Sequence, residues 1–466
     1  MATPHRFHRS TPIMAAACLA VSGLMIYAIL SDERPTTGGA DSGGGDALEI
    51  AVFLEARSDW SNFRKALHAC ARLGIVGSVT DGNEELGAIT SGRGRQLRFR
   101  RRADAGSQGL REAVKRMAER PVPPLAVIGS ANSLLTGTLA DQLARSFAPD
   151  AREGPLLFVP WASAVLIDAE DGEVPRRLLD VYPGRTFRFC PNNQREADLV
   201  VDGLLALDPR SKPCRALLIV DRRDPYSVDF ADCFRRSIAR AAPEAEIVER
   251  ADGLDFSGDE TGRPGPSEYA LAEAAWNSAG EGRAKGATWV VLPLLEEPAR
   301  RVLNALLDRA GKPMSEFGAG LLRVICGDAI GFEVLDELQA SSGPFPVWCP
   351  TSGAVLTGGR AGERLTPDTQ VLAEIIVALA IAVDSIDAPR PTPSDLHKAV
   401  EALDLPADDP RAFGRPLAFT RGHERKGDLA GHVLAYRPEE GGVVALERDS
   451  QGAWIATPAA VARPTE

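Results

Sequence analysis

The sequence has no excess of positive charge. It carries 53 Lys and Arg residues against 64 Asp and Glu residues, a formal net charge of −11 at pH 7. General nucleic-acid binding needs a basic face, so we expect no nucleic-acid partner. Hydrophobic residues make up 44% and charged residues 25% of the chain, which is typical of a globular protein. At 466 residues the chain exceeds one usual core, and length alone predicts two lobes.

Motifs of catalysis and cofactor binding are also missing. The sequence contains no G-x-S-x-G, no H-E-x-x-H, no P-loop, and no G-x-G-x-x-G between a strand and a helix. Its six histidines are scattered, without metal-ligand spacing. The acidic pairs Asp221/Asp224 and Glu296/Glu297 lie at predicted strand ends, but without a nucleophile motif a hydrogen-bonding or surface role is favoured. We expect no catalytic residues, no metal and no cofactor.

The seven cysteines include no C-x-x-C pair, which argues against a zinc ribbon or a thioredoxin-type motif. In an exported chain, pairs such as Cys190–Cys214 or Cys326–Cys349 are candidates for disulfides. The spacing does not choose between pairings, so this question stays open at the level of sequence.

The first 46 residues predict the compartment. A basic flank, residues 1–12, precedes an apolar run over residues 13–30, whose length of about 27 Å as a helix suffices to cross a bilayer core. Because the positive flank comes first, we expect it in the cytoplasm and the folded part outside, in the periplasm or its equivalent. Residues 31–46 are rich in Gly and read as a flexible linker. An uncleaved anchor is favoured over a cleaved signal peptide, because no clear cleavage site precedes Ser31.

The most informative stretch is residues 124–164. Two short apolar runs, Leu125–Ile128 and Leu156–Val159, predict buried parallel strands with a helix between them. Each run ends in small and hydroxyl residues, at Gly129–Ser133 and at Pro160–Ala164. In open α/β sheets, ligands bind at the carboxyl ends of the strands, where a helix N-terminus favours an anionic group. Ordinary βα turns explain the same residues, and both interpretations remain open.

The remainder of the chain alternates strands and helices in the same way. Apolar strands are predicted at Ala216–Val220, Thr288–Leu292 and Leu322–Cys326, each followed by a loop and a helical segment. This second unit repeats the first, and the fold class is α/β with two doubly wound parallel-sheet lobes. The expected domains are a first lobe of residues 47–165 with 345–390, a second lobe of residues 166–344 with 391–458, and a tail, 459–466.

The order of motifs resembles a known family, the leucine/isoleucine/valine-binding proteins of branched-chain amino-acid ABC transporters. The matching segments are VIGSANSLLTGTLADQLA, LLFVPWASA, FRFCPNNQREADLVVDGLL, LLIVDRRDPYSVDFADCFRRSI and WVVLPLLEEPARRVLNALLDRAG, with GRPL and KGDL near the C-terminus. The resemblance spans about residues 48 to 457. It implies a type I periplasmic binding fold, in which two lobes joined by a hinge close over a ligand in the cleft.

The resemblance also implies a binding site. Asn132 and Ser133 match the first-lobe loop that meets the ligand's carboxylate. Ala162, Ser163 and Ala164 match the second loop, whose backbone and hydroxyl groups hold the carboxylate and the ammonium.

Three further residues complete the expected site. Asp328 falls where the family places an acid against the α-ammonium, and Tyr226 matches an aromatic wall of the pocket. Trp60 lies in the first loop, Glu55–Ser61, which precedes a helix predicted for Asn62–Leu73, and it is expected to supply a second wall. Trp161 stands where the family usually has a glycine, and its indole is expected to fill part of the cleft.

The resulting expectation is a non-enzymatic, membrane-tethered solute-binding protein that traps an amino acid or a similar small polar ligand. An ABC permease in the membrane is the partner that the resemblance implies. The alternative is a membrane-tethered sensor or protein-interaction module on the same fold, with a cleft that has drifted from ligand binding. The residue pattern does not decide between them.

Overall fold

The computed structural model describes most of the chain after the predicted linker. The described residues are 47–54, 57–81, 86–102, 106–130, 132–147, 153–167, 175–250, 263–282, 286–310, 322–341, 343–351, 365–413, 415–426, 432–440, 442–448 and 453–458. The predicted flank, anchor, linker and C-terminal tail lie outside these ranges. No helix within them is both long enough and apolar enough to span a bilayer.

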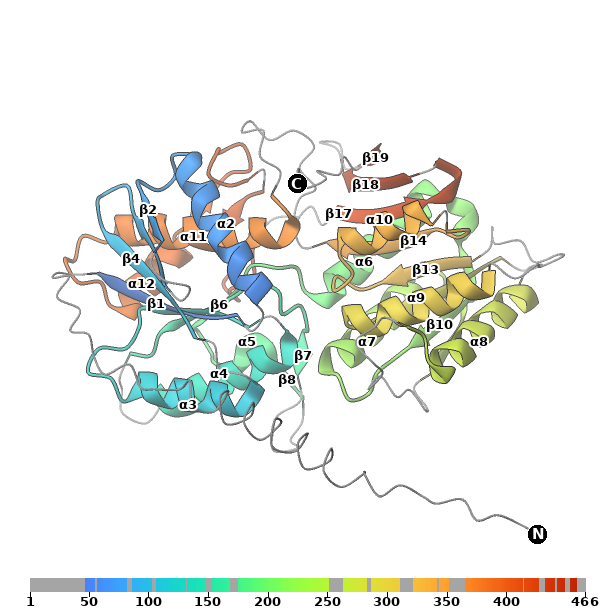
Figure 1. Ribbon diagram of the computed structural model, residues 1–466, viewed down its shortest axis with the longest axis horizontal. Coiled ribbons are helices and arrows are strands. Elements are labelled where there is room, and N and C mark those ends of the chain that lie inside the picture. Colours follow the sequence, from blue (N-terminus) through green and yellow to red (C-terminus); the bar gives the residue numbers. More distant parts are fainter. Residues whose placement is uncertain are drawn as a thin grey trace, which may run out of the picture. The chain divides into compact units, whose positions relative to one another are not determined.

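The first lobe, whose strands β1, β2, β4 and β6 are labelled in Figure 1, is built on a seven-stranded sheet in the order β2-β3-β4-β1-β5-β6-β9. Pairing is parallel from β4 to β9 and antiparallel between β2, β3 and β4. Its strands are β1 (Leu48–Phe53), β2 (Val79–Asp81), β3 (Leu86–Thr90), β4 (Gln96–Arg101), β5 (Ala126–Gly129), β6 (Leu156–Val159) and β9 (Thr186–Arg188). Every residue of β5 and β6 is buried, as expected for strands covered on both faces.

Two separate cores cover the faces of this sheet. On one face, α2 (Arg57–Arg72) packs against α11 (Pro367–Ser385), together with α12 (Pro393–Glu401) and the β15 (Asp404–Leu405) and β16 (Leu417–Ala418) pair. On the other face, α3 (Gly106–Ala118), α4 (Ser133–Phe147) and the short α5 (Leu178–Val181) form the second core. β7 (Leu166–Ile167) and β8 (Arg176–Arg177) form a separate small ribbon.

The second lobe contains an eight-stranded sheet in the order β11-β10-β12-β13-β14-β17-β18-β19. It is parallel from β11 to β14 and antiparallel beyond. Its strands are β10 (Pro213–Ile219), β11 (Glu246–Arg250), β12 (Ala287–Leu292), β13 (Leu322–Cys326), β14 (Val347–Thr351), β17 (His432–Arg437), β18 (Gly442–Arg448) and β19 (Trp454–Pro458). One face is covered by α8 (Pro266–Gly282), α9 (Glu296–Ala310) and α10 (Phe332–Ala340), the other by α6 (Asn193–Leu207) and α7 (Pro225–Ala241). Two 3₁₀ turns, η1 (Pro209–Ser211) and η3 (Pro438–Glu440), complete the elements.

The expected α/β class with two parallel-sheet lobes is confirmed, but the chain is divided between the sheets differently from our expectation. β9 pairs with β6 in the first sheet, although residues 166–344 were expected in the second lobe. β14 joins the second sheet, and α12 packs into the first-lobe core, both against expectation. Strand pairing decides the membership of β9 and β14, and core packing decides that of α12; a single sequence reveals neither.

The six described cysteines are free thiols, so the candidate pairs Cys190–Cys214 and Cys326–Cys349 are not disulfides in this structure. Four of the six are fully buried and a fifth nearly so, because a thiol packs as a small apolar group. Cys326 and Cys349 are part of the second-lobe core.

Candidate functional site

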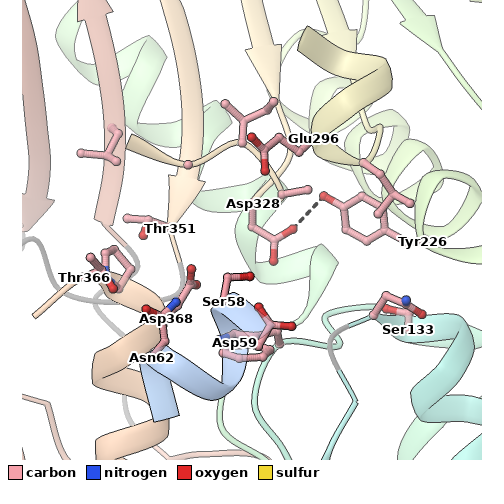
Figure 2. A pocket seen from close by; sticks show the side chains of 18 of the residues that line it. Ser58, Asp59, Asn62, Ser133, Tyr226, Glu296, Asp328, Thr351, Thr366 and Asp368 are labelled. Carbon is pink, nitrogen blue, oxygen red and sulfur yellow. Dashed lines mark hydrogen bonds between the residues drawn. The ribbon is translucent and has the colours of Figure 1, made fainter. Parts of the chain in front are cut away.

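A cavity of about 510 Å³ lies where strand ends and helix N-termini from both sheets meet (Figure 2). The carboxyl ends of β5, β6, β13 and β14 all contribute residues to it or lie next to residues that do. This is the edge at which α/β sheets bind ligands. The side chains with polar groups that line it are Ser58, Asp59, Asn62, Lys65, Asn132, Ser133, Trp161, Tyr226, Glu296, Asp328, Thr351, Thr366 and Asp368.

The central contact of the cavity joins two residues that the sequence predicted. The Tyr226 hydroxyl donates a hydrogen bond of 2.7 Å to Oδ1 of Asp328 (Figure 2). Tyr226 lies on the first turn of α7, where Asp224 caps the helix, and Asp328 follows β13. Tyr226 is buried and Asp328 is partly buried. The hydrogen bond fixes the direction in which the carboxylate points.

A second acid, Glu196 on α6, lies behind this pair and is fully buried. Burial raises the pKa of Glu196 well above its usual value, and the charge of Asp328 adds to the effect, while Arg188 acts against it. Burial likewise raises the pKa of Asp328, against the hydroxyl groups of Tyr226 and Ser163, which lower it. Two acids that interact in a dry environment favour one shared negative charge over two.

Asn132 and Ser133 form the first-lobe wall at the N-terminus of α4. Oδ1 of Asn132 accepts a 2.9 Å hydrogen bond from the backbone N–H of Leu135, as an N-cap does. Oγ of Ser133 accepts a 3.3 Å bond from the N–H of Ala164, leaving its hydroxyl proton to donate elsewhere. Both residues line the cavity, as the sequence placed them. Their predicted contact with a carboxylate stays a prediction.

Ala162, Ser163 and Ala164 are buried and are not lining residues of the cavity. The carbonyl of Ser163 accepts from the N–H of Asn193, and that of Ala164 accepts from the guanidinium of Arg188 at 2.6 Å. This loop therefore contacts the segment that crosses from β9 to α6 between the lobes. Trp161 itself is partly exposed and lines the cavity.

Trp60 does not form a wall of the cavity, contrary to expectation. The sequence suggested a loop up to Ser61, but α2 begins at Arg57 and places Trp60 on its inner face. Trp60 is 5% exposed and stacks on Phe63, with the ring centroids 5.2 Å apart, inside the first-lobe core. The opposite face of the same helix turns Asp59, Asn62 and Lys65 toward the cavity.

Sequence reasoning missed two groups of lining residues. The first consists of Ser58, Asp59, Asn62 and Lys65 on α2. Which face of α2 lines the cavity depends on where the helix begins, and the sequence did not predict its start at Arg57. The second is Thr366 and Asp368 at the start of α11, where Thr366 caps the helix by accepting from the N–H of Thr369. The sequence T-P-D-T, an N-cap followed by Pro and an acid, is a helix-start signal that marked this position. Glu296, for which the sequence favours a hydrogen-bonding or surface role, lies at the start of α9 and lines the cavity.

The charged residues among the described lining residues are predominantly acidic. Four carboxylates line the cavity and Lys65 is the only cation among these residues; the carboxylates are Asp59, Glu296, Asp328 and Asp368. Such a lining attracts a ligand that carries positive charge and repels a simple anion. A ligand with both charges still has an anchor for its negative end at Lys65 or at the N-terminus of α4.

Asp229 on α7 connects the second lobe to the first. Its carboxylate accepts hydrogen bonds from the backbone N–H groups of Val165, at 2.8 Å, and Leu166, at 3.1 Å. It also accepts a 2.8 Å bond from the side chain of Asn193. Three donors compensate for the burial of this carboxylate.

No protein-family model matches the sequence, and no curated protein matches it either. The fold does match solved structures. A leucine-, isoleucine-, valine-, threonine- and alanine-binding protein from Brucella ovis has a TM-score of 0.58 at 13% identity, over 89% of this chain and 94% of that one. A substrate-binding protein from Desulfitobacterium hafniense in complex with Leu has a TM-score of 0.55 at 14% identity, over 88% and 100%.

A solute-binding protein from R. palustris in complex with 4-hydroxybenzoate is similar to the same degree, with a TM-score of 0.55 at 11% identity, over 89% of this chain and 96% of that one. Chains of this kind share the type I periplasmic binding fold. This chain therefore has the fold that its motif order resembled. At these identities the likeness establishes the fold, whereas the ligand has to be argued from the cavity.

Proposed function

We propose that this chain is an extracytoplasmic solute-binding protein of the ABC-transporter type, and that its cavity holds a small ligand bearing an ammonium group. The observation that carries the proposal is the Tyr226–Asp328 pair in a cavity of about 510 Å³. The Tyr226 hydroxyl donates to one oxygen of the carboxylate, and Asp328 lines the cavity wall. A carboxylate held in one direction is suited to an ammonium ligand.

The charge of the lining supports this ligand class over aromatic acids. The neighbours named with leucine and with 4-hydroxybenzoate differ in whether their ligand carries an amino group. The cavity of this chain is lined by four carboxylates and by one ammonium group, that of Lys65. A ligand whose only charge is a carboxylate is therefore repelled, whereas the amino group of an amino acid or an amine is attracted. We propose an amino acid or a related amine as the ligand class.

A thermal-shift screen with Asp328→Asn tests the proposal. A ligand present at 100 times its dissociation constant adds about 2.7 kcal/mol to the stability of the folded protein, which raises the melting temperature. Loss of a charged hydrogen-bond acceptor, worth about 1.5–3 kcal/mol, weakens binding about ten- to hundredfold in Asp328→Asn. The matched control is Asp180→Asn, which neutralises an exposed acid that does not line the cavity.

The outcomes separate the two functions weighed for this fold. Amines or amino acids that shift the wild type and the control but not Asp328→Asn support solute binding. A panel without any shift contradicts it and favours a sensor or interaction module with an empty cleft. The predicted span 13–30 belongs to the same proposal: it would tether the protein outside the cytoplasm beside an ABC permease. Recovery of the full-length chain in the soluble fraction of lysed cells contradicts this tether.

A further inference from the structure

Three potential metal ligands that are distant in the sequence come together at the C-terminal end of α12. His397 and Glu401 lie one turn apart on this helix, and His423 comes from the segment after β16. Their ligand atoms all lie within 4.8 Å of one another. Oε1 of Glu401 is 3.1 Å from Nε2 of His423 and 3.7 Å from Nε2 of His397. The histidines look scattered in sequence, but the fold brings these two to one carboxylate.

His397 has a ring nitrogen that is available to a cation. Its Nε2 atom is buried and has no hydrogen-bond partner in the described part of the chain. A buried nitrogen without a partner is unfavourable, and a cation bound to it would remove that cost.

The surrounding residues fix the positions of the rings. Phe187 of β9 stacks on His423 with the ring centroids 4.4 Å apart, and it lies 5.6 Å from the ring of His397. The backbone carbonyl of His423 accepts a 3.1 Å hydrogen bond from the N–H of Arg188. Helix α12 is itself held by a capping box between Thr392 and Asp395. Rings that are held in place lose little entropy when they bind an ion.

We propose that His397, Glu401 and His423 form a binding site for a divalent transition-metal ion of the zinc class. Two imidazole nitrogens and one carboxylate are a donor set typical of Zn²⁺, whereas Mg²⁺ and Ca²⁺ prefer oxygen ligands alone. Two ligands that each lie about 2.0–2.2 Å from one zinc ion are at most about 4.4 Å apart, and the spacings of 3.1 and 3.7 Å from Glu401 to the two imidazoles meet this limit. The side chain of Glu401 is 44% exposed, so the ion and a completing water reach the site from solvent.

The site links the first lobe to the chain that enters the second. His397 and Glu401 belong to α12 of the first lobe, while His423 lies on the segment that leads to β17. The Arg188–His423 backbone bond attaches this segment to the end of β9, directly before the chain crosses to α6. A bound ion therefore fixes the connecting segments, and it does so outside the ligand cavity.

Isothermal titration of the chelator-treated protein with ZnCl₂ tests the proposal. His5 and His8 in the N-terminal segment are replaced by Ala in every sample, because they offer a second zinc-binding sequence. We expect one saturable zinc site, no comparable binding of MgCl₂, and at least tenfold weaker zinc binding in His397→Ala and in Glu401→Gln. Glu401→Gln changes an exposed side chain and keeps its shape, so misfolding does not explain a loss.

Two controls complete the test. His68→Ala removes a histidine elsewhere on the lobe, and Asp408→Asn removes an exposed acid that follows α12 in the sequence; both are expected to keep the wild-type affinity. Absence of a saturable zinc site, or an affinity unchanged in both His397→Ala and Glu401→Gln, overturns the proposal. Either result leaves the proposal of an ammonium ligand in the cavity unaffected.

Discussion

The Tyr226 hydroxyl donates a 2.7 Å hydrogen bond to Asp328 across 102 residues of sequence. This contact joins the first turn of α7 to the end of β13 and sets the direction of the one carboxylate on which the proposed ligand recognition depends. Gly327, which precedes Asp328, makes the contact possible. A Cβ atom at this glycine would lie 2.0 Å from the Tyr226 hydroxyl and 2.9 Å from the ring of Phe230.

Gly327→Ala is therefore expected to displace Tyr226 from Asp328. Overpacking at such a site costs about 1–3 kcal/mol, and the lost hydrogen bond weakens ligand binding as well. Thermal unfolding and ligand titration measure the two effects separately. Gly331→Ala is the matched control, because Gly331 also lines the cavity but has no heavy atom within 4 Å of an added Cβ. Equal behaviour of the two variants would contradict this role of the Tyr226–Asp328 contact.

Ligand affinity is expected to rise with pH through the raised pKa of Asp328. Burial raises this pKa in the free protein, so the contribution of Asp328 to folding stability is present at low pH and is lost as pH rises through the folded value. Burial favours the protonated form of Asp328, whereas a bound ammonium ligand favours its ionised form, so the ligand binds better where Asp328 is ionised. Binding titrations across pH measure the midpoint.

The same titrations on Tyr226→Phe identify the cause of the midpoint. The tyrosine hydroxyl lowers the pKa of Asp328, so its removal is expected to shift the midpoint to higher pH. Tyr269→Phe is the control, since that hydroxyl donates a 2.6 Å bond to Asp308 and lies outside the cavity. A midpoint that does not move in Tyr226→Phe is incompatible with control by Asp328.

Glu374 on α11 is expected to dominate the stability of the first lobe. Its buried carboxylate accepts hydrogen bonds from Arg415 and from Arg425, which are also buried. Glu374→Gln leaves two guanidinium groups without their counter-charge, at a cost of about 3–5 kcal/mol. Chemical denaturation measures it. Glu273→Gln, which disrupts an exposed pair with Arg309, is expected to cost at most about 1 kcal/mol.

The same cluster predicts acid sensitivity. Burial acts to raise the pKa of Glu374, but Arg415 and Arg425 outweigh it and hold the pKa below its usual value. A lowered pKa contributes stability that is present above the unfolded-state pKa and is lost as pH falls through the folded value. Unfolding free energies should therefore fall on acidification in the wild type and change less in Glu374→Gln. Parallel pH profiles of the two proteins would disprove this assignment.

Asp229→Ala is expected to loosen the contact between α7 and the first lobe. It leaves the N–H groups of Val165 and Leu166 without an acceptor, which costs about 1–3 kcal/mol. Hydrogen exchange at these two amides measures the effect directly and should accelerate. Asp232→Ala, on the same helix but paired with Arg235, is the control and should leave both amides protected. Unchanged exchange in Asp229→Ala would show that other contacts hold this segment.

The alternation of strands and helices was readable from the sequence, because buried parallel strands are short apolar runs and their helices carry a period of 3.6. The same pattern placed Ser133, Tyr226 and Asp328 after strand ends, and the family resemblance assigned them to one site; in the structure all three line one cavity. The sequence did not predict which lobe each segment belongs to. The β9 and α12 segments have local patterns that fit either lobe. β9 is placed by its pairing with β6, and α12 is placed by its packing into the first-lobe core.

Two features of the candidate sites depend on structural details that a sequence pattern does not predict. The start of α2 at Arg57 instead of Asn62 turned Trp60 inward and Asp59 toward the cavity, since a helix places neighbouring residues about 100° apart. His397 and His423 are 26 positions apart and meet only because the segment after β16 packs on Phe187. No spacing rule for metal ligands covers such a separation.

Calorimetric titration with matched ligands tests the central claim most directly. Each α-amino acid that shifts the melting temperature is compared with the amine that lacks its carboxylate and with the acid that lacks its amino group. Recognition of ammonium by Asp328 predicts that the amino acid and the amine bind, that the acid binds at least tenfold more weakly, and that Asp328→Asn removes the difference. Stronger binding of the acid than of the amine, or an unchanged preference in Asp328→Asn, would contradict the proposed site.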